Sequence, residues 1–135
     1  YLVTYGAKLV AFYPEETGIG KWEDLGGVFE TNQGEDWKPY VPNLNIGLNG
    51  KLYYVIGGHG NYVRKDKTVL IEFDPDKRKP NILLEFPIGR LTEVTGSDIR
   101  DKDGNMYFAG RKRPDRSENG SVPFLIKFNP EKEVK

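Results

Sequence analysis

The chain has 135 residues, of which 37% are hydrophobic and 13% aromatic, and its 20 basic residues balance its 20 acidic residues. This balance gives no general attraction to nucleic acid or to an anionic membrane, and no apolar run approaches the length that spans a bilayer. The absence of Cys excludes disulfides, thiolate metal sites and Cys nucleophiles. It fits both the cytoplasm and the bacterial periplasm, and we prefer a periplasmic or extracellular location.

Short strands joined by turns are expected along the whole chain, because 16 Gly and 9 Pro interrupt it and no long segment has the periodicity of an amphipathic helix. The first unit, about residues 1–30, begins at Tyr1 on what we interpret as the second strand of a four-stranded unit. A third strand is predicted over Lys8 to Tyr13 and a fourth near Trp22 to Gly26. We interpret Trp22 as a packing residue of this outer strand.

The second unit, about residues 41–88, contains all four strands. Residues 43–48 alternate polar and apolar, as a half-buried strand would. The apolar run "KLYYVIGG" after Asn49-Gly50 suits a strand that is covered on both faces. "TVLIEFDP" and "NILLEFP" complete the unit, and a proline ends each of them.

The third unit, about residues 93–135, has predicted strands at Thr95 to Arg100, Asn105 to Gly110 and Pro123 to Phe128. The segment "DKDGN" in this unit looks like the start of a calcium-binding loop. However, the sixth position is Met106, where an EF-hand needs Gly, and the twelfth is Lys112, where it needs Glu. We therefore interpret Asp103-Gly104 as a hairpin turn and predict no metal site.

Two sequence patterns recur along the chain. "NGKLYYVIGG" and "DGNMYFAG" both place an apolar and aromatic run after a turn that ends in Gly, and Gly50 and Gly104 are 54 residues apart (104 − 50). A second series consists of "LVAFYP", "LIEFDP" and "LIKFNP", which end at Pro14, Pro75 and Pro130. An internal repeat of about 55 residues, with four antiparallel strands in each unit, predicts the blades of a β-propeller.

The predicted fold is therefore all-β: a β-propeller segment of about two and a half four-stranded antiparallel blades that form an incomplete ring. The turn in "DKDGNMYF", followed by "LIKFNP", resembles blades of SMP-30/gluconolactonase-like, NHL-type and streptogramin-lyase-like propellers. The resemblance implies the architecture. In the lactonase-like members of this group, acidic and Asn side chains hold a metal in the central channel. We expect further blades or another chain to complete the ring.

In such a blade the turn that contains Asp101 lies on one face of the disc, and the longer loops lie on the other. Loops on a rigid scaffold commonly carry recognition, and aromatic and Arg side chains dominate the energy of interfaces. The candidate binding residues are therefore those of the long-loop face: Trp37, Tyr40, His59, Tyr62, Arg64, Arg111 and Arg113. The opposite, short-turn face carries Lys51, Asp76, Lys77 and Lys102.

These candidates also have simpler interpretations. His59, the only histidine, fits a solvent-exposed loop residue between glycines as well as a base or a metal ligand. Arg111 and Arg113 fit a basic rim for a carboxylate or a sulfated sugar, or a solvated loop whose charges largely cancel. Trp37 fits a residue packed between two blades as well as one that stacks on a sugar or docks a partner.

Two functional classes remain open, and the sequence does not decide whether the chain is an enzyme. We expect a non-catalytic scaffold and binding segment of a larger protein or complex, with a protein partner or a carbohydrate or carboxylate ligand and no cofactor. The alternative is part of a metal-dependent lyase or hydrolase with its site in the central channel. For that site only Asp98 and Glu93 are candidate side chains, and no catalytic residue is identified.

Overall fold

A computed structural model describes residues 1–4, 7–29, 41–56, 68–86, 91–96, 99–112 and 122–133. Within these ranges the chain forms ten β-strands, which make three antiparallel sheets, and one short helix, α1 (Pro130–Glu133). The prediction of an all-β fold is confirmed. In the same part of the chain, no helical segment has the length and apolar character needed to cross a membrane.

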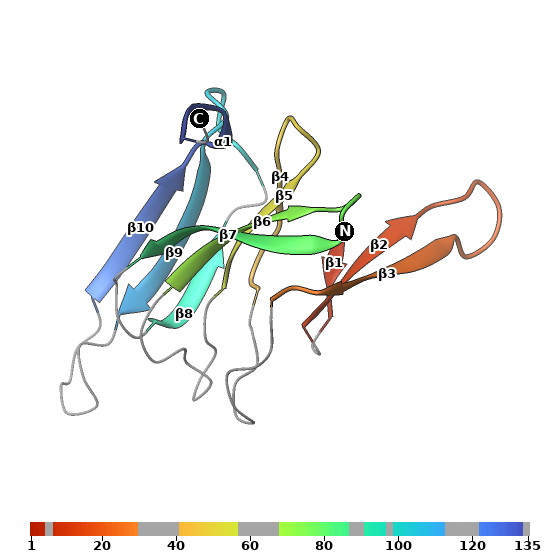
Figure 1. The fold of residues 1–135 in the computed structure, drawn as a ribbon, viewed down its shortest axis with the longest axis horizontal. Coiled ribbons are helices and arrows are strands. Elements are labelled where there is room, and N and C mark those ends of the chain that lie inside the picture. The colour runs from red at the N-terminus through yellow and green to blue at the C-terminus, as the bar shows by residue number, and fades with distance from the viewer. Residues whose placement is uncertain are drawn as a thin grey trace.

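The three sheets follow one another along the sequence, and in each of them strands that are consecutive in the chain lie side by side. The central sheet consists of β4 (Asn45–Ile46), β5 (Leu52–Ile56), β6 (Thr68–Asp74) and β7 (Lys79–Phe86). The first sheet consists of β1 (Leu2–Val3), β2 (Lys8–Tyr13) and β3 (Lys21–Gly27). The third sheet consists of β8 (Leu91–Gly96), β9 (Met106–Lys112) and β10 (Val122–Phe128). In Figure 1 the first and third sheets lie at opposite ends of the molecule, on either side of the central sheet.

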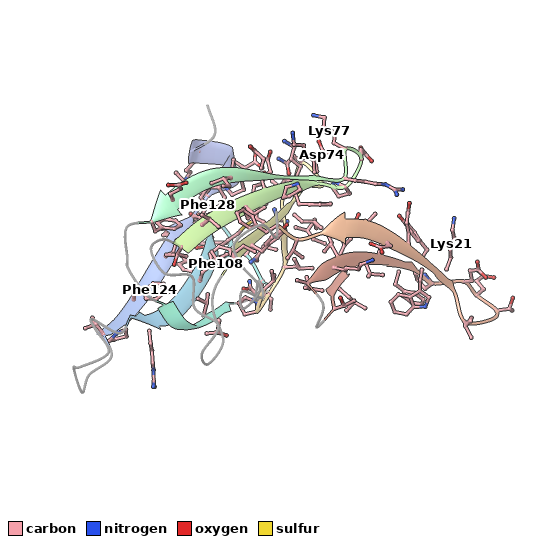
Figure 2. The ribbon with its side chains drawn as sticks, turned by 60° about the horizontal axis from the view of Figure 1, so that its bottom comes forward. Lys21, Asp74, Lys77, Phe108, Phe124 and Phe128 are labelled. Carbon is pink, nitrogen blue, oxygen red and sulfur yellow. The ribbon has the colours of Figure 1, made fainter. Side chains whose placement is uncertain are left out.

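Two hydrophobic cores cover the two faces of the central sheet. The first core packs Leu9 and Ala11 of β2 against one face of β5 and β6. The second core packs Phe108 of β9 and Phe128 of β10 against the other face. Figure 2 shows Phe108, Phe124 and Phe128 on the side of the third sheet that faces the central one. Every residue of β5 is consequently buried, as the run "KLYYVIGG" predicted.

Several predicted strand boundaries are confirmed, and those of the third sheet need correction. β2 has the predicted bounds, but β8 covers Leu91–Gly96 instead of Thr95 to Arg100. The reason is that β9 continues to Lys112, which pairs with Leu91 and so lets β8 begin at that residue. Arg111 was predicted on a long loop, yet it lies in β9, opposite Glu93 on one side and Pro123 on the other.

The alternating segment 43–48 forms a shorter strand than predicted, and its polar residues are the buried ones. Asn43 and Asn45 are 7% and 0% exposed, whereas Ile46 and Leu48 are 49% and 75% exposed. Asn43 lies close against the third sheet, because a Cβ on Gly96 would lie 2.6 Å from Asn43 Cγ and Nδ2 and closer still to its Oδ1. The apolar side of the segment is therefore left facing an open groove.

Candidate functional site

The open groove has a volume of about 990 Å³ and lies where β1, β4 and residues 99–104 converge. Its apolar lining comes from β1, from residues 41–48 and from Ile99, and its charged lining comes from residues 100–103 and Glu131. The groove thus combines apolar area with two cations and three carboxylates, which are Arg100, Lys102, Asp101, Asp103 and Glu131. Binding sites commonly have such a mixture of apolar walls and a few polar groups.

Much of the apolar lining is accessible to solvent. Leu2 is 51% exposed, Leu48 is 75% exposed and Ile99 is 76% exposed. β1 also lies at the edge of its sheet, with β2 as its ladder partner among the described residues. Contiguous exposed apolar surface and a strand edge both mark places where a protein contacts another molecule. The groove is therefore a candidate binding surface.

Asp101 is the most extensively hydrogen-bonded carboxylate of the groove. Its Oδ1 accepts hydrogen bonds from the backbone N–H groups of Asp103 and Asn105, each at 2.9 Å. Its Oδ2 accepts hydrogen bonds from Asn105 Nδ2 and the Tyr107 hydroxyl, each at 2.7 Å. The bond from the Asn105 side chain, followed by that from Tyr107, holds the pKa of Asp101 well below its usual range. This carboxylate stabilises the turn with all of its acceptor capacity.

The turn after Asp101 has the geometry that the sequence predicted. Gly104 has a φ of +82°, and its N–H donates to the Asp101 carbonyl at 3.0 Å. Asn129, at the end of β10, donates from its Nδ2 to the Asp103 carbonyl at 2.9 Å, which fixes the turn against the neighbouring strand. The interpretation of Asp103-Gly104 as a turn is confirmed.

The turn between β4 and β5 repeats this geometry 54 residues earlier (104 − 50). Gly50 has a φ of +76°, and its N–H donates to the Gly47 carbonyl at 3.1 Å. Tyr53, three residues after that glycine, donates from its hydroxyl to Glu72 Oε2 at 3.0 Å and accepts from Asn49 Nδ2 at 2.9 Å. Burial is the largest of the effects that raise the pKa of Tyr53 above its usual value.

Glu72 is buried and pairs with Lys51, whose Nζ lies 2.8 Å from Glu72 Oε1. The hydrogen bond to Glu72 is the main reason why the pKa of Lys51 is raised. Lys51 was predicted as a residue of the short-turn face, but its pairing with a buried carboxylate was not predicted. The pairing depends on the register between β5 and β6, which the sequence alone does not give.

Of the predicted binding residues, Arg111 lies within the described part of the chain, exposed near the end of β9. The others lie outside the described residues, as Asp98 does: Trp37, Tyr40, His59, Tyr62, Arg64 and Arg113. The groove was not among the predicted sites, and its residue Lys102 belongs to the predicted short-turn face. The signal that could have revealed it is the pair of apolar residues, Leu48 and Ile99, that shortly precede the two turns.

Among the described residues, no group of three or more His, Asp or Glu side chains is placed to hold a metal ion. Comparisons with known proteins give no match: neither a family model, nor a curated protein, nor a solved structure is similar to the chain. The function therefore has to be inferred from the packing of the sheets, the groove and the chemistry of the loops.

Proposed function

We propose that the chain is a segment of a β-propeller and that it serves as a non-catalytic scaffold and binding surface within a larger protein or complex. The packing of the sheets supports this proposal. "LVAFYP", "LIEFDP" and "LIKFNP" begin on β2, β6 and β10. Their first residue is Leu and their fourth residue is Phe in each case.

Each of these two repeat positions packs in one constant direction, and the two directions are opposite. Leu9 packs toward the central sheet, and Leu70 packs toward the third sheet, so each Leu contacts the sheet that follows it in the chain. Phe73 and Phe128 each pack toward the sheet that precedes them. Successive antiparallel sheets with one constant facing relation are what the blades of a propeller require.

The binding role is proposed for the long-loop face, which includes the β5–β6 and β9–β10 connections. Rigid strands flank both connections, and such loops commonly carry recognition. With Arg64, Arg111 and Arg113, the chemistry of this face suits an acidic protein surface, a carboxylate or a sulfated carbohydrate.

Dextran sulfate and citrate are suitable probes, with affinity measured by isothermal titration calorimetry. Changing Arg111 and Arg113 together to Ala should weaken binding by roughly tenfold or more, because Arg side chains contribute disproportionately to interfaces. Lys77→Ala on the short-turn face is the control that should leave affinity unchanged. An equal loss in this control would point to general charge attraction and contradict the choice of face.

The carboxylates that line the groove are the observation that bears on a second candidate, part of the central channel of a metal-dependent lyase or hydrolase. Asp103 and Glu131 are the carboxylates that would take part, since Asp101 already accepts four hydrogen bonds. If the scaffold proposal is right, adding calcium or manganese should change neither the Tm of the wild type nor that of Asp101→Ala. An increase in Tm that Asp103→Asn abolishes would favour the enzyme instead.

A further inference from the structure

The same repeat position is buried inside the stack of sheets and exposed at its two ends. Phe73 and Phe128 are 0% and 1% exposed, whereas their counterpart Phe12 is 38% exposed. Leu70 is 0% exposed, whereas its counterpart Leu125 is 67% exposed. Side chains of the kind that fill the two internal cores therefore also lie on the outer faces of the first and third sheets.

The outer face of the first sheet carries an apolar strip across three strands. Phe12 and Trp22 are cross-strand partners whose ring centroids lie 4.5 Å apart, and Leu2 pairs with Val10. Cross-strand partners share one face of a sheet, and alternate residues of a strand share it too. We call this strip the Phe12 face; it consists of Leu2, Val10, Phe12 and Trp22.

The outer face of the third sheet is less bulky. Leu125 of β10 lies opposite Ala109 of β9, and the next pair on the same face are Lys127 and Tyr107. Pro123 lies on this face as well, two residues before Leu125, and is exposed. We call this surface the Leu125 face; it consists of Tyr107, Ala109, Pro123 and Leu125, with Lys127 and Arg111 on the same side of the sheet.

We propose that the Phe12 face of one copy of this chain docks on the Leu125 face of a second copy, head to tail. The chain already makes this kind of contact twice, because each internal interface places the Leu of one sheet and the Phe of the next in a shared core. Leu125 and Phe12 are the two members of the series that remain without such a core within the described structure. Docking the first sheet of one copy on the third sheet of another continues the same interface.

The docking inference rests on the proposed repeat architecture and adds that a second copy of the chain covers the two outer faces. Since the Phe12 face and the Leu125 face differ, the contact is heterologous: each copy uses one face and leaves the other available. The Phe12 face is rimmed by Lys8 and Asp24, which form an ion pair of 2.7 Å with each other. This pair leaves the Phe12 face without net charge from its rim, where it would meet the cations Lys127 and Arg111 of the Leu125 face.

Sedimentation velocity of the 135-residue chain over a range of concentrations tests the proposal. The wild type should self-associate, and Phe12→Glu and Leu125→Glu should each weaken association by roughly tenfold or more, because a carboxylate would be placed in an apolar interface. Each variant keeps one intact face, so an equimolar mixture of the two should form a one-to-one dimer. Ile19→Glu is the control, since Ile19 is 89% exposed in the β2–β3 turn and belongs to neither face.

Three results would overturn the inference. The first is a wild type that is monomeric at every concentration. The second is association that Phe12→Glu disrupts and Leu125→Glu does not, which would indicate that two Phe12 faces pair with each other. The third is a mixture of the two variants that stays monomeric. The circular dichroism spectrum of each variant checks that it is folded. A monomeric chain that still binds dextran sulfate through the long-loop face would refute the docking alone, whereas self-association without probe binding would refute the proposed binding role alone.

Discussion

At the scale of single residues, the turns before β5 and β9 build one backbone geometry with different side chains. Both turns place a glycine at positive φ and make the same pair of backbone hydrogen bonds. The tyrosine three residues later anchors each turn, but Tyr53 bonds to Glu72 whereas Tyr107 bonds to Asp101. The sequence predicts the glycines because few other residues adopt this conformation. It does not predict the tyrosine partners, which depend on tertiary structure.

Gly104→Ala isolates the conformational cost of one of these turns. A Cβ on Gly104 would meet no atom closer than Asn129 Nδ2 at 3.7 Å, so steric contact adds little to that cost. We expect Ala to lower the free energy of unfolding by about 1 kcal/mol, and Asn to lower it less, because Asn tolerates the left-handed region. Urea denaturation measures both changes. Equal losses for Ala and Asn would indicate that something other than backbone conformation sets the cost.

The Asp101 turn also predicts a pH dependence. The pKa of Asp101 in the folded protein is lower than in the unfolded chain, so the folded state favours its charged form. Its contribution to stability is therefore complete above the unfolded pKa of about 3.9 and is lost as the pH falls through the folded pKa. The Tm difference between wild type and Asp101→Asn should be largest near neutral pH and shrink on acidification. A difference that stays constant with pH would contradict this role of the charge.

At the scale of the strands, the sequence predicts most clearly where apolar composition is strongest. β5 and β6 follow from their continuous apolar runs, and β2 from "KLVAFY". Residues 43–48 show why the remainder is harder to predict. An alternating pattern defines two faces of a strand, but the neighbouring sheet decides which of them is buried. Here close packing against Gly96 buries Asn43 and leaves Ile46 exposed.

Gly96→Ala tests this contact between the central and third sheets. A methyl group there would lie 2.6 Å from Asn43 Cγ and Nδ2, and Asn43 is too buried to move away freely. We expect a loss of about 1–3 kcal/mol in the free energy of unfolding, as is typical of overpacking. Gly27→Ala is the control, because its nearest contact would be an ordinary 3.4 Å.

A double-mutant cycle distinguishes steric conflict from a general loss of flexibility. Asn43→Ala removes the group that the new methyl would meet, so the combined variant should lose less stability than the sum of the single losses. Strict additivity would mean that Gly96 and Asn43 do not interact as the packing indicates.

At the scale of the whole molecule, β5 and β6 in the middle of the central sheet are the most deeply buried of these strands. All five residues of β5 are buried, whereas one of the seven residues of β3 and two of the seven residues of β10 are. The repeat in the sequence predicts that equivalent residues have equivalent roles. It does not predict whether a sheet has a neighbouring sheet on both of its faces or on one. A given Leu or Phe stabilises the folded chain only where a neighbouring sheet buries it.

The pair Leu70 and Leu125 measures this difference directly, because the two residues hold the same position in "LIEFDP" and "LIKFNP". Leu70 is fully buried, so Leu70→Ala should lower the free energy of unfolding by about 2–5 kcal/mol. Leu125 is 67% exposed. Leu125→Ala should therefore change stability by no more than about 0.5 kcal/mol in dilute solution, as is usual for surface positions. At concentrations where copies dock, its cost should increase, because association stabilises the folded chain by mass action. Urea denaturation at low and high protein concentration separates the two regimes, and equal costs for both leucines in dilute solution would contradict the repeat-based assignment of the end faces.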